Sequence, residues 1–325
     1  MTLWPADRPF AWHDGERTVH FGRGSLAALP GLLDDAFALL TTPRARVQAP
    51  ALADLAEAVH HVPAGTVDAV AGALRSEVRG GLLVALGGGR VIDVAKALAA
   101  ADGPRTVVAV PTTLSGAEMT AIHRLAPGTP AARARVRPAL VVWDPSLLDT
   151  LGAPGRAASA MNALGHAAEA PLTPHASPLA RLAADAAVAH LERGLGDGPV
   201  DDLALGAMLA GYAIGTAGYG LHHVLAQTVA RECGAGHGAA NTVMLPHALG
   251  ALVRRFPGRA DPDGRIARLA DAGAAAAGVE RLRDLGVTRD DLDHLATVAA
   301  ARAELHETPP PASREELHAL YAAAW

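Results

Sequence analysis

Short apolar runs alternate with a helical pattern in the first half of the chain. Three such runs, residues 81–86, 106–110 and 139–143, each lead into a loop that contains glycine, proline or aspartate. The segment RVIDVAKALAA follows the first run and has apolar residues at helical spacing. Buried strands separated by helices are typical of a parallel sheet with crossover helices. We therefore expect an α/β fold here.

Long helical patterns rich in alanine and leucine fill the second half, and no convincing strand is predicted there. Residues 177–195, 202–218 and 265–277 are examples. Ser313 and Glu316 predict a capping box for a last helix over residues 314–324. The glycine- and proline-containing segment at 152–155 predicts a boundary. We expect an α/β domain over residues 1–152, an all-helical domain over 153–325, and a ligand site in the groove between them.

The segment of residues 203–230 contains no Asp, Glu, Lys or Arg, and it is long enough to span a membrane. The segment is rich in Gly and Ala and holds two histidines, so we favour a buried helix pair broken near residues 218–220. The N-terminus has no basic start followed by an apolar run and does not predict a secretory signal.

Composition narrows the function classes. Of the 325 residues, 50% are hydrophobic and 19% are charged, which indicates a folded protein. A net charge of −5 and an aromatic content of 3% argue against nucleic acid as a partner. The single cysteine, Cys233, excludes an internal disulfide and favours the cytoplasm. Among 28 basic residues the only lysine is Lys96, so that position either keeps it by chance or needs a compact ammonium.

The triglycine Gly87-Gly88-Gly89 stands between a predicted strand and a predicted helix. Glycines at such a point let the backbone approach a ligand, and the helix N-terminus favours an anion such as a pyrophosphate. Asp93 and Lys96 lie on the first turns of that helix. The spacing is not the GxGxxG fingerprint, and a tight turn without any ligand is the plain alternative.

Several motifs together resemble the iron-containing alcohol dehydrogenase superfamily, and its maleylacetate reductase branch in particular. GGGRVIDVAKALA is similar to the superfamily's GGGSxxDxAK, and PTTLSGAEMT to the branch's PTTxxGSEMT. MNALGHAAEA and GLHHVLAQ…GHGAANTVMLPHAL resemble its two histidine-containing segments. The likeness runs from about residue 18 to the C-terminus and implies a dehydroquinate synthase-like α/β domain that binds a dinucleotide.

The resemblance implies NAD(H) or NADP(H) as the cofactor, bound through the first domain. Its pyrophosphate would lie on Gly87, Gly88 and Gly89, and Arg90 would either touch phosphate or stay solvated. The remaining residues that the resemblance assigns to cofactor binding are Asp93, Lys96, Thr112, Thr113, Ser115 and Thr120.

The resemblance also assigns His166, His223 and His237 to catalysis. In the metal-dependent members an Asp and three His hold the metal, but Asn162 stands here where that Asp would be. Because a neutral amide is a weaker ligand, we expect no metal, although three histidines alone can hold zinc. The histidines would then bind an anionic substrate and act as general acid, unless they are only structural.

The substrate region departs from the family pattern. Gln227 replaces the usual His, and Val224 replaces a Lys. We expect Asn162 and Gln227 to contact the substrate, with Arg124 and Arg231 as candidate replacements for the lost cation.

The leading hypothesis is an NAD(P)H-dependent reductase, a homodimer by analogy, that passes hydride to an unsaturated or keto acid in a biosynthetic or aromatic-degradation pathway. The partner is a small molecule, with neither nucleic acid nor membrane involved. The alternatives are a non-redox protein on the same scaffold (a lyase, cyclase, isomerase or binding protein) and a metal-dependent alcohol dehydrogenase.

Overall fold

The computed structural model of the protein describes residues 3–33 and 35–325. The chain forms two compact units, Met1–Leu151 and Gly152–Trp325.

The first unit is built on a mostly parallel sheet. Within the described residues its seven strands follow the order β1-β2-β7-β6-β5-β3-β4, and every neighbouring pair except β1–β2 is parallel. The strands are β1 (Phe10–Asp14), β2 (Arg17–Phe21), β3 (Ala38–Thr41), β4 (Ala58–His61), β5 (Leu82–Gly87), β6 (Thr106–Pro111) and β7 (Leu140–Trp143). The predicted α/β fold class is thereby confirmed.

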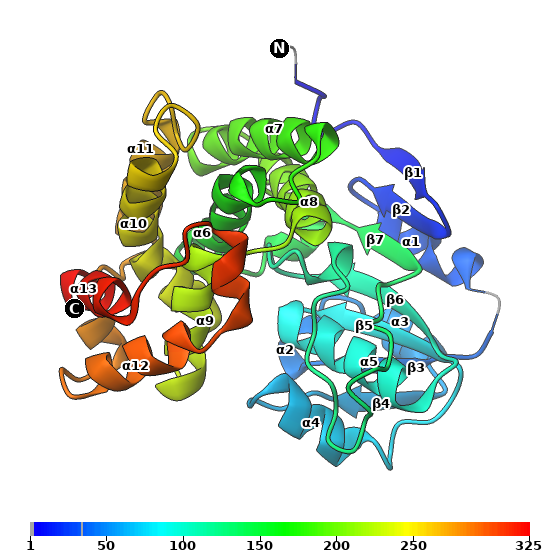
Figure 1. Cartoon of the computed structure of the whole chain (residues 1–325). Coiled ribbons are helices and arrows are strands. Elements are labelled where there is room, and N and C mark those ends of the chain that lie inside the picture. The colour runs from blue at the N-terminus through cyan, green and yellow to red at the C-terminus, as the bar shows by residue number, and fades with distance from the viewer. Residues whose placement is uncertain (1–2, 34) are drawn as a thin grey trace. The chain divides into compact units, whose positions relative to one another are not determined.

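Helices connect these strands and cover the sheet (Figure 1). They are α1 (Ser25–Ala28), α2 (Pro43–Arg46), α3 (Pro50–Leu55), α4 (Val67–Leu74) and α5 (Gly89–Asp102), with short 3₁₀ helices η1 (Leu29–Leu32), η2 (Ala117–Met119) and η3 (Pro145–Leu148). All six residues of β5 are buried, and α5 packs against both β5 and β6. A strand that lies in the middle of a covered parallel sheet reads as a continuous apolar run, which is why the sequence revealed it.

The pattern of apolar residues did not reveal β1 to β4. β1 and β2 alternate partly exposed and more buried residues and form an antiparallel hairpin, while β4 is short and largely exposed. β3 is buried but has only four residues. Strands that are this short or half exposed contain too few consecutive apolar positions for a readable pattern.

The second unit consists of helices throughout its described length. They are α6 (Ala153–Glu169), α7 (Pro178–Leu195), α8 (Val200–Ala217), α9 (Leu221–Glu232), α10 (His237–Arg255), α11 (Arg265–Ala277), α12 (Asp291–Ala300) and α13 (Arg314–Ala324), with 3₁₀ helices η4 (Ala170–Leu172), η5 (Leu282–Leu285) and η6 (Ala303–Glu307). One large apolar cluster joins α9, α10, α12 and α13, and the hydroxyl of Tyr321 within it donates to the carbonyl of Leu225 at 3.2 Å.

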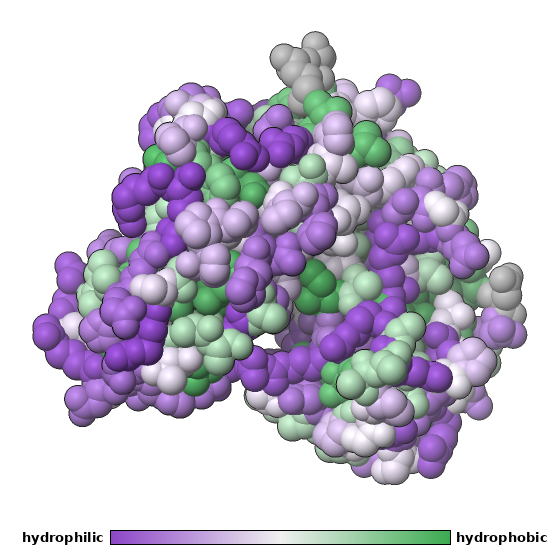
Figure 2. Space-filling view, in the orientation of Figure 1, coloured by the Kyte–Doolittle hydropathy of each residue, from purple (hydrophilic) through white to green (hydrophobic). Residues whose placement is uncertain are grey.

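The uncharged segment at 203–230 is the expected broken helix pair. α8 ends at Ala217 and α9 begins at Leu221. Gly218 between them has a φ of 80°, a backbone angle that residues other than glycine rarely adopt. In the described part of the chain no helix has both the length and the apolar character that crossing a membrane requires. Hydrophilic residues are interspersed with hydrophobic ones over the face shown in Figure 2.

The predicted cap of the last helix is half right. The hydroxyl of Ser313 accepts from the backbone N–H of Glu316, as expected. The carboxylate of Glu316 does not complete the box, because it pairs with the guanidinium of Arg255 on α10 instead. A charged partner forms a stronger hydrogen bond than a backbone N–H does.

A buried carboxyl joins the sheet to the segment after β6. Glu118 on η2 is fully buried, and its Oε1 accepts from Nε1 of Trp143 on β7 at 3.0 Å. Arg17 on β2 donates to the carbonyl of Met119 at 3.0 Å. Burial raises the pKa of Glu118 from 4.5 to about 7, against the opposing effect of the hydrogen bonds and of the charges on Lys96 and Arg17.

Replacing Glu118 by glutamine should flatten the pH dependence of stability. The carboxyl ionises near pH 4.5 in the unfolded chain and near pH 7 in the folded one, so the free energy of unfolding falls as pH rises through this window. The loss from this one group approaches about 3 kcal/mol by pH 8, whereas the neutral amide keeps the Trp143 contact and avoids it. Denaturant unfolding of both proteins at pH 5 and pH 8, followed by tryptophan fluorescence, measures the difference.

The control is Glu77→Gln, because Glu77 is exposed. A Glu118→Gln protein with the same pH dependence as the Glu77→Gln protein would contradict the burial of an ionising group.

Candidate functional site

The triglycine loop joins the C-terminal end of β5 to the first turn of α5. Gly87 ends the strand and Gly89 begins the helix. A Cβ on Gly88 would lie 3.0 Å from the side chain of Thr113, and one on Gly89 would lie 2.9 Å from that of Ser115. The loop therefore has to be free of side chains for the segment after β6 to lie beside it. The first N–H groups of α5 have no acceptor within their own helix, which suits them to an anion.

Three of the predicted cofactor residues gather at this edge of the sheet. Thr112, Thr113 and Ser115 directly follow β6, the neighbour of β5. Arg44 on α2 also reaches the edge and donates from Nη2 to the hydroxyl of Thr112 at 3.2 Å. The carboxyl ends of adjacent parallel strands meet at one edge of a sheet, and ligands of open α/β sheets bind there.

Lys96 holds the segment that follows these residues. Its fully buried ammonium donates to the carbonyls of Ala117, Thr120 and Ile122 at 2.8, 3.1 and 3.0 Å. Its Nζ also lies 2.7 Å from a carboxylate oxygen of Asp93 one turn earlier on α5. An ammonium directs its three protons from one point, whereas a guanidinium spreads its donors over a plane. The geometry supports the interpretation that position 96 needs a lysine.

Two other predicted residues of the first unit lie apart from this network. Arg90 is exposed at the second position of α5, and Arg124 donates to the carboxylate of Asp68 on α4 at 3.1 Å. Burial opposes the ionisation of Asp68, but its hydrogen bonds and the charge of Arg124 hold its pKa below the ordinary value. The guanidinium of Arg124 is thus already matched by a carboxylate.

Replacing Lys96 should destabilise the first unit even when positive charge is kept. Lys96→Met leaves three carbonyls without their donor and Asp93 without its counter-charge, which costs about 3 to 5 kcal/mol. Lys96→Arg should recover little of this loss, because its flat donor group cannot meet three carbonyls around one point. Thermal and denaturant unfolding of both variants measures the effect.

Asp93→Asn serves as the control, since it keeps the three carbonyl contacts and should cost less than Lys96→Met. A Lys96→Arg protein as stable as the wild type would show that any cation suffices at this position.

In the second unit, α6 and α9 bring three imidazoles together. The rings of His166 on α6 and His223 on α9 are stacked, with centroids 4.6 Å apart, and the ring of His222 meets that of His223 edge-on at 4.7 Å. Gly165 permits this approach, because a Cβ there would lie 2.3 Å from Nε2 of His222. The glycine that precedes His166 is therefore part of the packing of the cluster.

A fully buried carboxylate, Glu169, organises the cluster. It ends α6 and accepts from the backbone N–H groups of His222 and His223 at 2.8 and 3.4 Å, so that it caps the first turn of α9. It also lies 2.8 Å from Nδ1 of His223. This contact assigns the proton of the neutral imidazole to Nδ1 and makes Nε2 the acceptor. Nε2 of His223 is buried and has no hydrogen-bond partner among the described residues.

The histidines of the cluster are neutral at physiological pH. Burial is the main cause that lowers the pKa of His222 and that of His223 to about 3, and the positive charges of His237 and Arg302 add to the effect at His223. The pKa of His166 is also lowered, by burial first and by the neighbouring histidines next. A charged imidazole here would lose its hydration and repel the others.

The remaining predicted residues of this unit lie at various distances from the cluster. Asn162 is buried on α6 one turn before His166, and His237 is exposed at the start of α10. Gln227 lies one turn after His223 on α9 and accepts from Arg302 at 2.9 Å. Arg231 is exposed, eight residues beyond His223, which is about 12 Å along the helix axis.

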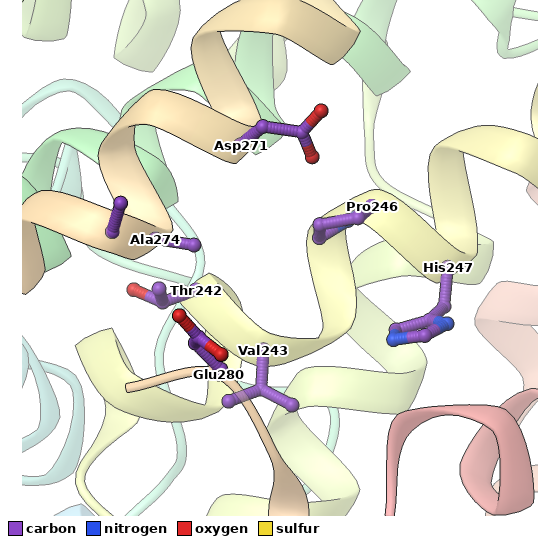
Figure 3. Close-up of a pocket in the computed structure, with 8 residues that line it drawn as sticks. Thr242, Val243, Pro246, His247, Asp271, Ala274 and Glu280 are labelled. Carbon is purple, nitrogen blue, oxygen red and sulfur yellow. The ribbon is translucent and has the colours of Figure 1, made fainter. Parts of the chain in front are cut away.

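A pocket of about 280 Å³ lies elsewhere in the second unit, between α10 and α11 (Figure 3). His247 lines it together with the carboxylates of Asp271 and Glu280, and the histidines of the cluster do not. Two carboxylates would repel an acid, so this pocket does not suit an anionic substrate.

Comparisons with known proteins agree with the motifs. Residues 16–145 match the family model described as iron-containing alcohol dehydrogenase, and residues 156–325 match its Fe-containing alcohol dehydrogenase C-terminal counterpart. The chain belongs to the iron-containing alcohol dehydrogenase family. The predicted resemblance is confirmed, and with it the expectation of an oxidoreductase.

Maleylacetate reductases are among the relatives. The enzyme of Pseudomonas aeruginosa is 33% identical over 93% of this chain and 94% of its own length, and maleylacetate reductase 2 of Cupriavidus pinatubonensis is 34% identical over 97% and 96%. The crystal structure of maleylacetate reductase from Agrobacterium tumefaciens superposes with a TM-score of 0.80 at 27% identity, covering 98% of both chains.

The family name implies iron, but the described side chains of this chain do not fit an iron site. Asn162 offers an amide where a carboxylate would bind a cation better. The rings of His166 and His223 lie face to face, 17° from parallel, rather than converging on one point. In the described part of the chain no group of three His, Cys, Asp or Glu side chains is placed to hold a metal ion.

The prediction of site residues missed three side chains that the structure places among the candidates. Glu169 and Arg302 contact residues around His223, and Arg44 contacts Thr112. The signal for Glu169 was its position three residues after His166, which puts both on one face of α6. No spacing rule could reveal Arg302, which lies 79 positions beyond His223 in the sequence.

Proposed function

We propose that this chain is an NAD(P)H-dependent reductase that reduces an unsaturated or keto acid, as a relative of the maleylacetate reductases. The observation that carries the proposal is full-length identity of about one third to those enzymes. Residues 1–152 form the cofactor-binding domain, and residues 153–325 bind the substrate. A homodimer and a cytoplasmic location belong to the same proposal.

The residues of the first domain fit a dinucleotide. A loop without side chains, a helix N-terminus and the hydroxyls of Thr112, Thr113 and Ser115 meet at one edge of the sheet. These are the groups that bind a pyrophosphate and a ribose. Lys96 acts as a positioning residue, since its ammonium holds backbone carbonyls. When bound, a reduced nicotinamide supplies the hydride.

In this proposal His223 of the second domain positions the proton source. Reduction of a carbon–carbon double bond conjugated to a carbonyl takes one hydride and one proton, and the carbonyl oxygen carries negative charge in between. The single proton of His223 points to Glu169, so its Nε2 accepts a hydrogen bond rather than giving a proton away. We therefore assign the proton to a water molecule that donates one hydrogen bond to Nε2 of His223 and transfers its other proton to the substrate, and the hydroxide left behind is reprotonated by solvent water.

Wild-type protein should oxidise NADH or NADPH in the presence of at least one unsaturated keto acid from a panel. Gly88→Val should abolish this activity and weaken the binding of both dinucleotides, because its side chain would fill the loop against Thr113. Nicotinamide absorbance follows the reaction, and fluorescence enhancement of the reduced dinucleotide follows binding.

Gly81→Ala is the matched control, because a Cβ at Gly81 meets nothing within 4 Å. Tight dinucleotide binding without turnover of any acid would contradict the reductase. Wild-type protein that binds neither dinucleotide would instead favour a non-redox role for the scaffold.

We also propose that the enzyme works without a metal, on the strength of Asn162 and of the stacked rings of His166 and His223. Elemental analysis of the purified protein should find iron and zinc far below one ion per chain, and a chelator should leave the activity unchanged. Asn162→Asp should raise zinc uptake, since it supplies a carboxylate. Stoichiometric iron or zinc in the wild type, lost together with activity on chelation, would favour a metal-dependent alcohol dehydrogenase.

A further inference from the structure

Arg302 brings a buried positive charge to the edge of the histidine cluster. Its side chain is 11% exposed and precedes η6. Its Nη2 lies 2.9 Å from Oε1 of Gln227, 3.1 Å from the hydroxyl of Tyr219 and 2.9 Å from a carboxylate oxygen of Glu304, whose other oxygen accepts from Nε at 3.3 Å. Three side chains, from α9, η6 and the connection between α8 and α9, therefore fix one edge of the guanidinium.

The opposite side of the guanidinium, at Nη1, makes no hydrogen bond within the described residues. Nη1 of Arg302 is buried and has no hydrogen-bond partner among the described residues. A buried N–H of a charged group without an acceptor is costly, and proteins rarely keep one without a use. Glu304 covers the edge formed by Nε and Nη2, so the two protons of Nη1 stay free for an acceptor from outside the chain.

Contacts with α9 place this cation next to His223. Gln227, which Arg302 holds, is one turn beyond His223 on the same face of the helix. The ring of Tyr219 contacts both side chains, with its centroid 5.7 Å from that of His223 and 5.9 Å from Cζ of Arg302. The charge of Arg302 is close enough to contribute to the lowered pKa of His223.

The charge at position 302 persists in spite of burial. Burial alone would lower the pKa of Arg302, but the hydrogen bond and charge of Glu304 outweigh it, and the pKa is raised. In turn Arg302 overcomes the effect of burial on Glu304 and lowers its pKa to about 2. The pair is thus ionised over the whole working range of an enzyme.

We propose that Arg302 is the residue that recognises the substrate, by donating from Nη1 to a carboxylate of the unsaturated or keto acid beside His223. The assignment rests on the proposed function. It makes the preferred substrate class a dicarboxylate or keto acid rather than a neutral aldehyde or alcohol. The neutral residues Val224 and Gln227 then need no cationic substitute on α9, because the cation comes from the segment before η6.

The alternative is that Arg302 is a structural clamp, a residue that only joins α9 to η6. Replacing such a clamp would weaken the binding of acids and of neutral analogues equally. An anion-binding residue affects acids selectively, and this difference is what the test measures.

The first test is equilibrium binding of maleate, a simple unsaturated dicarboxylate, by calorimetry, with neutral dimethyl maleate as the comparison. Wild-type protein should bind maleate, and Arg302→Met should bind it about 10- to 100-fold more weakly, the range for one hydrogen bond to a charged group. Arg302→Lys should recover part of the affinity. Arg254→Met, which removes an exposed arginine of the same unit, should leave it unchanged.

Folding is controlled separately. Arg302→Met leaves Glu304 without its partner, so Arg302→Met/Glu304→Gln removes both charges and should regain stability but not maleate binding. Circular dichroism and thermal unfolding of each variant identify any loss of fold. Maleate bound equally well by the wild type and a folded Arg302 variant would overturn the assignment, and so would a wild type that does not bind maleate.

The second test separates this proposal from the proposed function. For the keto acid turned over best by the wild type, Arg302→Met should raise KM about 10- to 100-fold and leave kcat/KM for the methyl ester nearly unchanged. Equal losses on acid and ester would overturn the assignment in favour of the clamp. A wild type that binds maleate through Arg302 yet oxidises no reduced dinucleotide would defeat the reductase and leave the anion site standing.

Discussion

The second unit depends on one buried carboxylate. Glu169 ends α6, caps α9 with two backbone hydrogen bonds and contacts Nδ1 of His223, all from a position that water does not reach. A carboxylate without hydration is tolerable only when N–H donors surround it, so the two helices and the ring have to meet at this point. One of the three contacts that satisfy the charge, the one with Nδ1, also fixes the tautomer of His223. Stability and chemistry are therefore served by a single set of atoms.

The first unit solves a corresponding problem with the opposite charge. The ammonium of Lys96 is buried under the segment after β6 and is satisfied by three carbonyls of that segment and by Asp93. The segment has no regular ladder of its own to hold it, since η2 is its only helical turn within the described residues. Lys96 on α5 holds the segment instead, through hydrogen bonds to its carbonyls. In both units a buried ion orders the loop or helix end that carries the candidate chemistry, while loops without such an ion would be free to move.

Neutral residues distinguish the second unit from the metal-dependent pattern that its motifs resemble. Asn162 stands where the metal-dependent members would have an Asp, and Val224 and Gln227 stand where the family motifs usually have a Lys and a His. The imidazoles that remain are uncharged because they are buried and close together. A cation next to such a cluster lies in a medium of low polarity, where an interaction with an anion is stronger than in water. Arg302 supplies that cation, with its geometry set by Tyr219, Gln227 and Glu304.

The sequence by itself determined the parallel sheet, the change to an all-helical second half and the glycine loop, because continuous burial and helical spacing leave local patterns. It also singled out Lys96, and the family motifs grouped His166, His223 and His237 as one predicted site. Only the tertiary structure decided what these residues touch. The three carbonyl partners of Lys96, the place of Glu169 at the start of α9 and the arrival of Arg302 beside Gln227 all join positions 21 to 75 residues apart. Contacts between distant segments arise from tertiary packing, and they produce no local pattern in the sequence from which they could be predicted.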